Sequence, residues 1–308
     1  MADTRHLISL RDLTDADLDR IVRRGREIAA EDPAVRKEPL RGRVIGVYFS
    51  KTSTRTRTSF TAGALRLGAR VVTFGPGDLQ LNTGETLADT ARVLGGMLDG
   101  LVIRTAGAPE ELRRFAEHCP AVVNAMSADE HPTQALADLT TLWSRLGRLD
   151  GLKLLYAGEG NNTAAALALA LPRFSAVELE FRTPPGYGLE PAVLAEAQAL
   201  AARSGSRVSE RHDMESLPEG ADVVYTTRWQ TTGTSKSDPA WQRVFEPFQV
   251  NAAVMARCPD ALFMHDLPAH RGQEVTAEVL DGPLSIAFEQ AQYKLHSATA
   301  VLEWCLGQ

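Results

Sequence analysis

Residues 44–60 read VIGVYFSKTSTRTRTSF, an apolar run that leads through hydroxyl and arginine side chains into a helix-like segment. The apolar part, 44–49, predicts a strand. The first backbone N–H groups of a helix have no partner within the helix and lie at the positive end of its dipole. A strand that turns into a helix at this point therefore predicts a binding site for an anion such as phosphate.

The side chains of this motif would strengthen such a site. Ser53 and Thr54 offer hydroxyls, and Arg55 offers a planar guanidinium that suits phosphate oxygens. The motif lacks the glycines and the lysine of a nucleotide P-loop, so we expect a phosphate carried by a small molecule. Taken alone, the motif is also compatible with a capped surface helix whose arginines are solvated.

The composition narrows the class of protein. The 308 residues, of which 44% are hydrophobic and 23% charged, are enough for two globular domains. A formal net charge of -6 argues against a general nucleic-acid binder. We see neither a secretory leader nor a membrane span, so we expect a cytoplasmic protein without a membrane partner. The cysteines Cys119, Cys258 and Cys305 suit reduced structural thiols.

Strand-like and helix-like segments alternate along the chain, which predicts an α/β protein with parallel sheets. We expect strands at 44–49, 70–74, 100–104, 152–157, 176–181, 222–226 and 261–264. We expect helices at 10–28, from the motif to about Gly68, and at 85–98, 132–147, 163–171, 191–202 and 288–306.

The alternation restarts after Gly147. We therefore predict two doubly wound parallel-sheet domains, residues 1–147 and residues 148–287, with a cleft between them. The last helix, about 288–308, is expected to pack back onto the first domain.

Further polar residues accompany the motif in a fixed order. A predicted strand ends at Arg104, and His-Pro-Thr-Gln, residues 131–134, begins a predicted helix. Together with GETLADTARVL at 84–94, these features resemble the aspartate/ornithine carbamoyltransferase family. The resemblance covers nearly the whole chain and is closer to the ornithine branch. Other residues that show it are Asn161-Asn162, LPAHRG at 267–272 and Leu295-His296.

The resemblance implies a carbamoyl phosphate site. Its residues would be Ser53, Thr54, Arg55, Thr56, Gln80, Arg104, His131, Gln134 and Lys294. Gln80 would enter the site of a neighbouring subunit in a homotrimer or a multiple of trimers. Arg55, Arg104 and His131 would be catalytic, because negative charge grows on the carbonyl oxygen when an amine attacks. The departing phosphate could accept the amine's proton, so no protein base, metal or organic cofactor is expected.

The acceptor side departs from the ornithine pattern. An aspartate of that pattern is Thr227 here, and its Ser-Met pair is Thr231-Thr232. Without the carboxylate, a buried ammonium of the acceptor loses its partner, which costs about 2–5 kcal/mol. Ornithine in its usual pose is therefore disfavoured.

Other substitutions also alter the chemistry of the acceptor side. Arg228 and Gln230 are similar to the Arg-x-Gln element of aspartate carbamoyltransferases, which suggests an acceptor with a carboxylate. Ordinary aspartate carbamoylation is also doubtful, because a lysine of those enzymes is Thr83 here and an arginine is missing from residues 159–163. The His-Cys-Leu-Pro element of ornithine enzymes has Asp266 in place of cysteine, and Lys294 replaces an arginine and loses its bidentate fork.

We therefore expect a carbamoyltransferase that uses carbamoyl phosphate and an amino-acid-like amine other than standard ornithine, and releases a ureido product and phosphate. The acceptor contacts would be Asn162, Thr227, Arg228, Gln230, Asp266 and, through its carbonyl, Leu267. Two alternatives stay open. One is an ordinary ornithine carbamoyltransferase that makes citrulline in arginine biosynthesis. The other is a non-catalytic homologue that only binds carbamoyl phosphate, against which the intact motifs speak.

Overall fold

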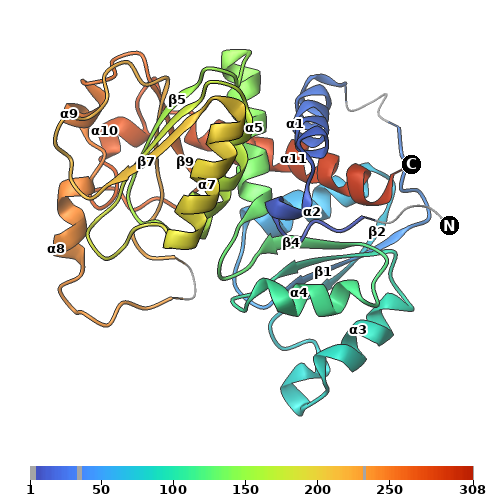
Figure 1. Ribbon diagram of the computed structural model, residues 1–308. Helices are drawn as coiled ribbons and strands as arrows, with labels where there is room; N and C mark the ends of the chain where they lie inside the picture. Colours follow the sequence, from blue (N-terminus) through green and yellow to red (C-terminus); the bar gives the residue numbers. More distant parts are fainter. Residues whose placement is uncertain (1–4, 33–36, 232–233, 308) are drawn as a thin grey trace. The chain divides into compact units, whose positions relative to one another are not determined.

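The computed structural model describes residues 5–32, 37–231 and 234–307 (Figure 1). The chain divides into two compact units, the first formed by residues up to 140 and from 292 onward, the second by residues 141–291. Two helices contribute residues to both units, namely α5 (Pro132–Leu146) and α11 (Ala287–Leu306).

The first unit is built on a parallel sheet with strand order β2-β1-β3-β4. The strands are β1 (Val44–Phe49), β2 (Arg70–Phe74), β3 (Gly100–Arg104) and β4 (Val122–Met126). The helices before α5 are α1 (Asp15–Ala30), α2 (Arg55–Arg66), α3 (Leu87–Gly95) and α4 (Pro109–Ala116), with 3-10 turns at Leu10–Asp12 and Gln80–Thr83.

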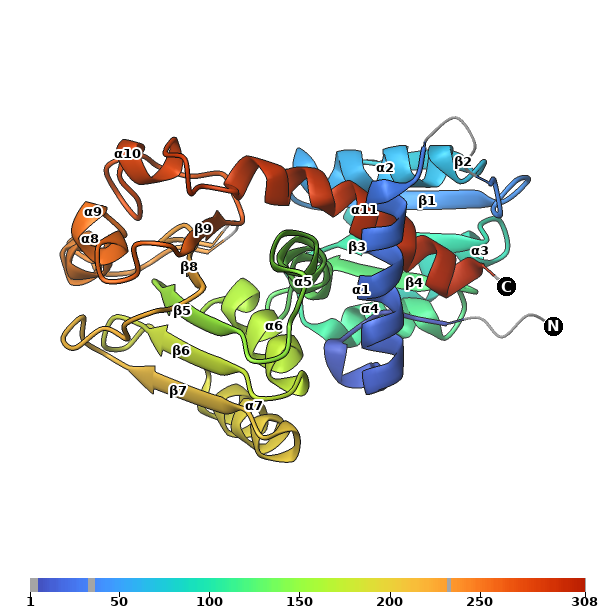
Figure 2. The ribbon, with the colours of Figure 1, turned by 90° about the horizontal axis from the view of Figure 1, so that it is seen from above.

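Helices cover both faces of this sheet, because side chains of a strand point alternately to its two faces and both sets are apolar. Tyr48, Leu101 and Ile103 pack with residues of α3 and α4. Helices α2 and α11 lie on the opposite face (Figures 1 and 2). Residues 45–49 and 100–104 are buried in consequence.

The second unit has a parallel sheet with order β7-β6-β5-β8-β9. Its strands are β5 (Lys153–Ala157), β6 (Glu178–Arg182), β7 (Arg207–Arg211), β8 (Val223–Thr226) and β9 (Leu262–His265). Its helices are α6 (Asn162–Ala170), α7 (Pro191–Ser204), α8 (Gln242–Phe245), α9 (Ala252–Met255) and α10 (Ala277–Leu280), with 3-10 turns at Leu171–Arg173 and Glu246–Phe248.

Each sheet has a point where the strand order reverses direction. It lies between β1 and β3 in the first unit and between β5 and β8 in the second. Loops at the carboxyl ends of such strands diverge to opposite sides, and ligands of parallel α/β sheets bind there. The residues that follow β1, β3, β5 and β8 are therefore the first places to look for a site.

The predicted fold class, two parallel-sheet α/β domains, is confirmed. The helix predicted over 10–28 is present as α1, but it begins at Asp15 and not at Leu10. Ser9 caps a 3-10 turn at Leu10–Asp12, and Thr14 then caps α1, which begins at Asp15. Strands β4 and β7 and helix α4 were not predicted. The cleft expected between the domains stays a prediction.

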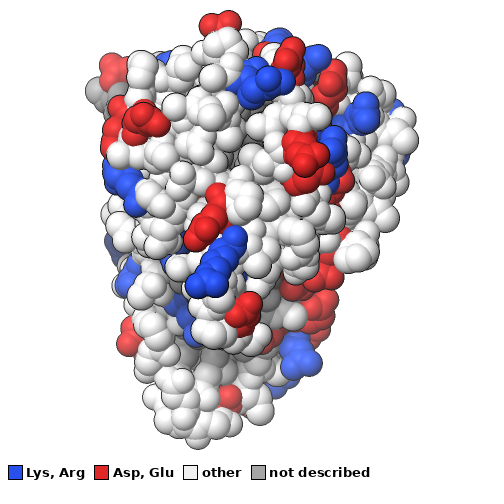
Figure 3. Space-filling model, turned by 90° about the vertical axis from the view of Figure 1, so that its left-hand side faces the viewer, with Lys and Arg blue, Asp and Glu red and all other residues white. Residues whose placement is uncertain are grey.

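None of the described helices is long and apolar enough to cross a membrane. On the face shown in Figure 3, lysines and arginines lie interspersed with aspartates and glutamates. Among the described residues, this face therefore has no wide patch of one charge.

Candidate active site

The start of α2 has the geometry of an anion site. The residue before the helix, Thr54, has helical dihedral angles and makes no side-chain cap bond. An N-cap hydroxyl usually accepts a bond from the first turn, so the first N–H groups of α2 keep their donor capacity and the Thr54 hydroxyl stays available. Thr54 is exposed, Arg55 is half-buried and Thr56 is buried.

Arg104 reaches this motif from the neighbouring strand. Phe49 and Arg104 are register partners at the carboxyl ends of β1 and β3. The Ser50 N–H donates to the Arg104 carbonyl at 3.0 Å, and the Arg104 guanidinium donates to the Ser53 hydroxyl at 3.4 Å. The sheet therefore holds a buried guanidinium beside the N-terminus of α2.

His131 immediately precedes α5 and is buried. Its pKa lies well below 6.5, first because burial disfavours the charged ring and then because of the charges of Lys294, Arg104 and Arg55. The ring is neutral at physiological pH and carries one N–H. His131 is thus suited to donate a hydrogen bond to an oxygen that gains negative charge.

Gln134 is oriented by charged partners on both ends of its amide. Its nitrogen donates to Asp138 at 2.8 Å, and its oxygen accepts a hydrogen bond from the Lys294 ammonium. Lys294 lies on α11 and is buried. The charges of Arg55, Arg104 and Lys294 all lower the pKa of His131. This group of cations is a local feature, because the net charge of the protein is -6.

Gln80, the other residue assigned to this site from sequence, lies in the 3-10 turn Gln80–Thr83. It is exposed, and its side-chain oxygen accepts the Thr83 hydroxyl at 2.9 Å. The role predicted for Gln80 in a neighbouring subunit stays a prediction.

In the second unit, Thr227 follows β8 and its hydroxyl is held in a chain of bonds. The Tyr156 hydroxyl donates its proton to the Glu159 carbonyl at 2.6 Å, so Thr227 must be the donor in its 2.8 Å contact with Tyr156. Thr227 also accepts from the Asn161 amide at 3.0 Å. With Thr227 only 1% exposed, its hydroxyl proton is used inside the protein.

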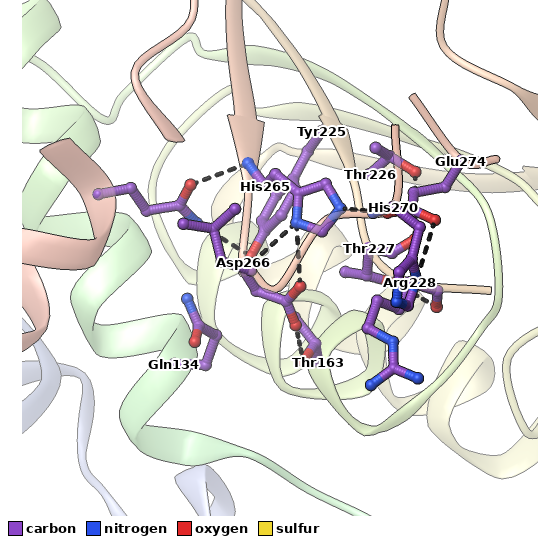
Figure 4. A network of polar contacts seen from close by, with 12 residues as sticks. Gln134, Thr163, Tyr225, Thr226, Thr227, Arg228, His265, Asp266, His270 and Glu274 are labelled. Atoms are coloured by element: carbon purple, nitrogen blue, oxygen red, sulfur yellow. Dashed lines mark hydrogen bonds and ion pairs between the residues drawn. The ribbon is translucent and has the colours of Figure 1, made fainter. Parts of the chain in front are cut away.

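Asp266 and its neighbours form a second network at the end of β9 (Figure 4). The His265 Nδ1 accepts the Leu267 N–H at 2.8 Å, and its Nε2 faces the Glu274 carboxylate at 3.2 Å. Figure 4 shows the ring with Glu274 on one side and Asp266 on the other. Asp266 lies 3.5 Å from Nδ1, which is too far for a bond, and accepts the Thr163 hydroxyl at 3.1 Å.

The remaining residues predicted on the acceptor side belong to the same unit. Asn162 is the first residue of α6 and is buried. Arg228 is half-buried, and Gln230 donates to the Thr234 carbonyl at 2.7 Å. Leu267 has φ of 52°, a left-handed conformation that non-glycine residues rarely adopt and that occurs often at functional sites. Thr232 lies outside the described residues.

Sequence reasoning missed three buried or nearly buried charged residues that organise these groups. Glu130 anchors the loop before His131, Glu274 orients His265, and Lys236 pairs with Glu159. The only signal in the sequence for a role of Glu130 was its position directly before His-Pro-Thr-Gln. Lys236 is distant along the chain from its partner Glu159, and a loop separates Glu274 from its partner His265. Neither pairing could be predicted from the sequence.

Comparison with known proteins agrees with this geometry. Residues 5–144 match the family model described as aspartate/ornithine carbamoyltransferase, carbamoyl-P binding domain, and residues 150–305 match the Asp/Orn binding domain of that family. The chain is 41% identical over 305 residues to an ornithine carbamoyltransferase of Symbiobacterium thermophilum, with 97% of this chain and 96% of the relative covered. It is 41% identical over 302 residues to the anabolic ornithine carbamoyltransferase of Pseudomonas aeruginosa, again covering 97% and 96%.

Solved structures give the same result. The structure of ornithine carbamoyltransferase from Pyrococcus furiosus aligns with a TM-score of 0.92 at 36% identity, over 99% of this chain and 97% of that one. Two parallel α/β units that match both domain models of this family over nearly the whole chain define an enzyme of the carbamoyltransferase class. The chain belongs to the aspartate/ornithine carbamoyltransferase family.

Proposed function

We propose that this enzyme transfers the carbamoyl group of carbamoyl phosphate to the side-chain amine of ornithine, giving citrulline and phosphate. The observation that carries the transfer chemistry is the neutral, buried His131 among Arg55, Arg104 and Lys294. The names of the relatives support ornithine as the acceptor, and they favour it over the different acceptor that the sequence analysis expects.

The residues of the first unit suit a carbonyl group joined to a phosphate. The N–H groups at the start of α2 and Arg55 would bind the phosphate oxygens. Arg104, His131 and the Thr54 hydroxyl would donate to the carbonyl oxygen, where charge grows in the transition state. The amine nitrogen forms the new C–N bond, the C–O bond to phosphate breaks, and phosphate takes the amine's proton.

A different amino-acid acceptor is the second candidate, and the second unit supports it. Thr227 offers no carboxylate where the ornithine pattern has one, and its hydroxyl proton is used internally. Asp266 instead supplies a carboxylate held by Thr163. An acceptor whose ammonium reaches Asp266 and whose carboxylate reaches Arg228 would fit this charge pattern.

The test is a product-mass assay with carbamoyl phosphate and a panel of acceptors: ornithine, lysine, putrescine, 2,3-diaminopropionate, 2,4-diaminobutyrate and aspartate. Rapid citrulline formation is the expected result. A ureido product from another acceptor, with ornithine poor, would establish the second candidate instead. Carbamoyl phosphate binding without turnover of any acceptor would contradict both and favour the non-catalytic homologue.

The control is His131→Ala. Loss of one hydrogen-bond donor to the developing oxyanion should lower kcat by about 10²–10³-fold. Circular dichroism should show an unchanged fold. A His131→Ala enzyme with full kcat would contradict the role proposed for His131.

We also propose the arrangement expected from sequence. Residues 1–147 would bind carbamoyl phosphate and residues 148–287 the acceptor. Gln80 would complete the site of a neighbouring subunit in a homotrimer, and the enzyme would act in the cytoplasm.

A further inference from the structure

Lys236 places an ammonium group inside an aromatic cage in the second unit. Its Nζ lies 4.7 Å from the ring centre of Tyr187, 5.2 Å from that of Trp241 and 5.1 Å from that of Phe245. The same nitrogen pairs with the Glu159 carboxylate, and the side chain of Lys236 is only 6% exposed. Lysines are rarely buried, and rings at these distances attract a cation.

The cage is built from rings that also pack on one another. Tyr187 and Phe245 lie 4.8 Å apart between ring centres, and Trp241 meets Phe245 edge-on at 5.3 Å. The Tyr187 carbonyl accepts the Gly160 N–H at 2.8 Å, which ties the cage to the loop after β5. The cage is thus supported by packing and by the backbone, independently of the ammonium.

Glu159 connects this cage to the predicted acceptor residues. Its carboxylate pairs with Lys236 and also accepts the Thr231 hydroxyl at 3.2 Å. Its carbonyl accepts the Tyr156 hydroxyl, which in turn accepts from Thr227. Glu159 therefore contacts the segment after β8 directly at Thr231 and Lys236. It also contacts Thr227 indirectly, through the Tyr156 hydroxyl.

Between these points the segment is tied to itself. Gln230 donates to the Thr234 carbonyl, and the Thr234 hydroxyl donates to the Thr231 carbonyl at 2.8 Å. Arg228 and Gln230 thus lie on a stretch whose far end is fixed by a buried ion pair. Removing one partner of such a pair leaves a charge without its counterion in a site of low polarity.

We propose that Lys236 and Glu159 are positioning residues that set the acceptor specificity of the enzyme by fixing Thr227, Arg228 and Gln230. This inference rests on the proposed function, because it concerns the same acceptor residues. The cage is a preformed ammonium site that the protein's own lysine fills. Lys236 and Glu159 belong to the second unit, whereas the residues proposed for carbamoyl phosphate belong to the first.

The decisive variant is Lys236→Met, which keeps bulk and removes the charge. We expect the KM of the best acceptor to rise at least tenfold, while the KM of carbamoyl phosphate changes less than twofold. Lys236→Arg should restore most of the acceptor affinity, because it keeps the cation over the rings. The matched control is Lys153→Ala, since Lys153 is an exposed lysine of the same unit paired with Glu178, and it should behave as the wild type.

A second variant, Lys236→Ala, empties the cage. Addition of millimolar ethylammonium should fill it, change the tryptophan fluorescence saturably through Trp241, and lower the acceptor KM again. Fluorescence that does not respond, or a response that leaves the acceptor KM unchanged, would contradict the proposal.

Hydrogen exchange separates this inference from the proposed function, because it needs no turnover. Lys236→Met should speed exchange in peptides that contain Thr227 to Thr231, and Lys153→Ala should not. Absence of turnover in the wild type would overturn the proposed function, and unchanged exchange would overturn the positioning role. Should Lys236→Met unfold, Glu159→Gln, which keeps the shape of the carboxylate, replaces it with the same expected results.

Discussion

Single side chains show how burial and neighbouring charge select one protonation state. His131 stays neutral because it is buried and three cations act on it. In His265 the geometry fixes the ring instead, because Nδ1 accepts the Leu267 N–H. The His265 ring is thereby oriented with its Nε2 toward Glu274.

The lowered pKa of His131 predicts a pH dependence of stability. Between that pKa and the ordinary value of 6.5, the unfolded chain binds more protons than the folded one. The free energy of unfolding should therefore decrease as pH falls below about 6.5. His131→Asn should make this decrease smaller, as measured by urea unfolding at a series of pH values.

The control for this measurement is His118→Asn, a half-buried histidine at the end of α4 that lies outside the cluster of cations. It should keep the pH dependence of the wild type. Equal slopes for His131→Asn and the wild type would show that His131 does not contribute in this range.

The residue types of the candidate site could be chosen from the sequence at this scale, and their bonding could not. Arg55, Arg104, His131 and Gln134 stand in short motifs whose residue types suit an anion. The direction of the Thr227 hydroxyl depends on Tyr156 and Glu159, residues whose contacts require the folded sheet. The Lys236 cage likewise depends on rings at 187, 241 and 245 that converge only in three dimensions.

Secondary-structure elements position the site through their ends. The strand β4 pairs with the segment before α1, since Leu7 and Val123 form a bridge and Asn124 donates to the Leu7 carbonyl at 2.7 Å. Glu130, just before α5, fastens the same segment. Its carboxylate accepts the Leu10 N–H at 2.7 Å and the Ser9 hydroxyl at 2.6 Å.

Glu130→Ala should destabilise the protein, because it leaves the buried Leu10 N–H and Ser9 hydroxyl without their acceptor. The free energy of unfolding should fall by about 1–3 kcal/mol for each unsatisfied group. Activity should fall as well, since His131 follows directly. Urea unfolding and kcat measure the two effects.

Glu117→Ala, an exposed glutamate that ends α4, is the control and should change stability by less than about 0.5 kcal/mol. A Glu130→Ala protein as stable as this control would mean that the Ser9–Leu10 segment finds other acceptors.

The two strands that were missed, β4 and β7, have an apolar run that is interrupted or absent. Strands β1, β2 and β3 were predicted with the observed limits. The edge strand β7 reads Arg-Val-Ser-Glu-Arg, which carries no such pattern. In β4 the polar Asn124 interrupts the run, and its burial depends on bonds to the Ile8 carbonyl and the Ser127 hydroxyl.

For the whole molecule, assembly can be tested through Gln80. If Gln80 completes a neighbour's site, Gln80→Ala and His131→Ala should each have a strongly lowered kcat alone and complement each other when unfolded and refolded together. In a random mixture about one quarter of the sites would combine an intact His131 with an intact Gln80. Recovered kcat and the mass from light scattering check this.

A mixture that stays inactive while light scattering reports a trimer would place Gln80 in its own subunit's site. A monomer with full activity would contradict the trimer itself.

The bonds of Thr227 determine what its replacement by aspartate would cost. The Tyr156 hydroxyl has one proton and gives it to the Glu159 carbonyl. An aspartate at 227 would have no proton to offer Tyr156, so either the new carboxylate or the Glu159 carbonyl would lose a donor, at about 1–3 kcal/mol. Thr227→Asp is therefore unfavourable as a single substitution, and the surroundings of Tyr156 would have to change first, so the order of substitutions matters as much as their identity.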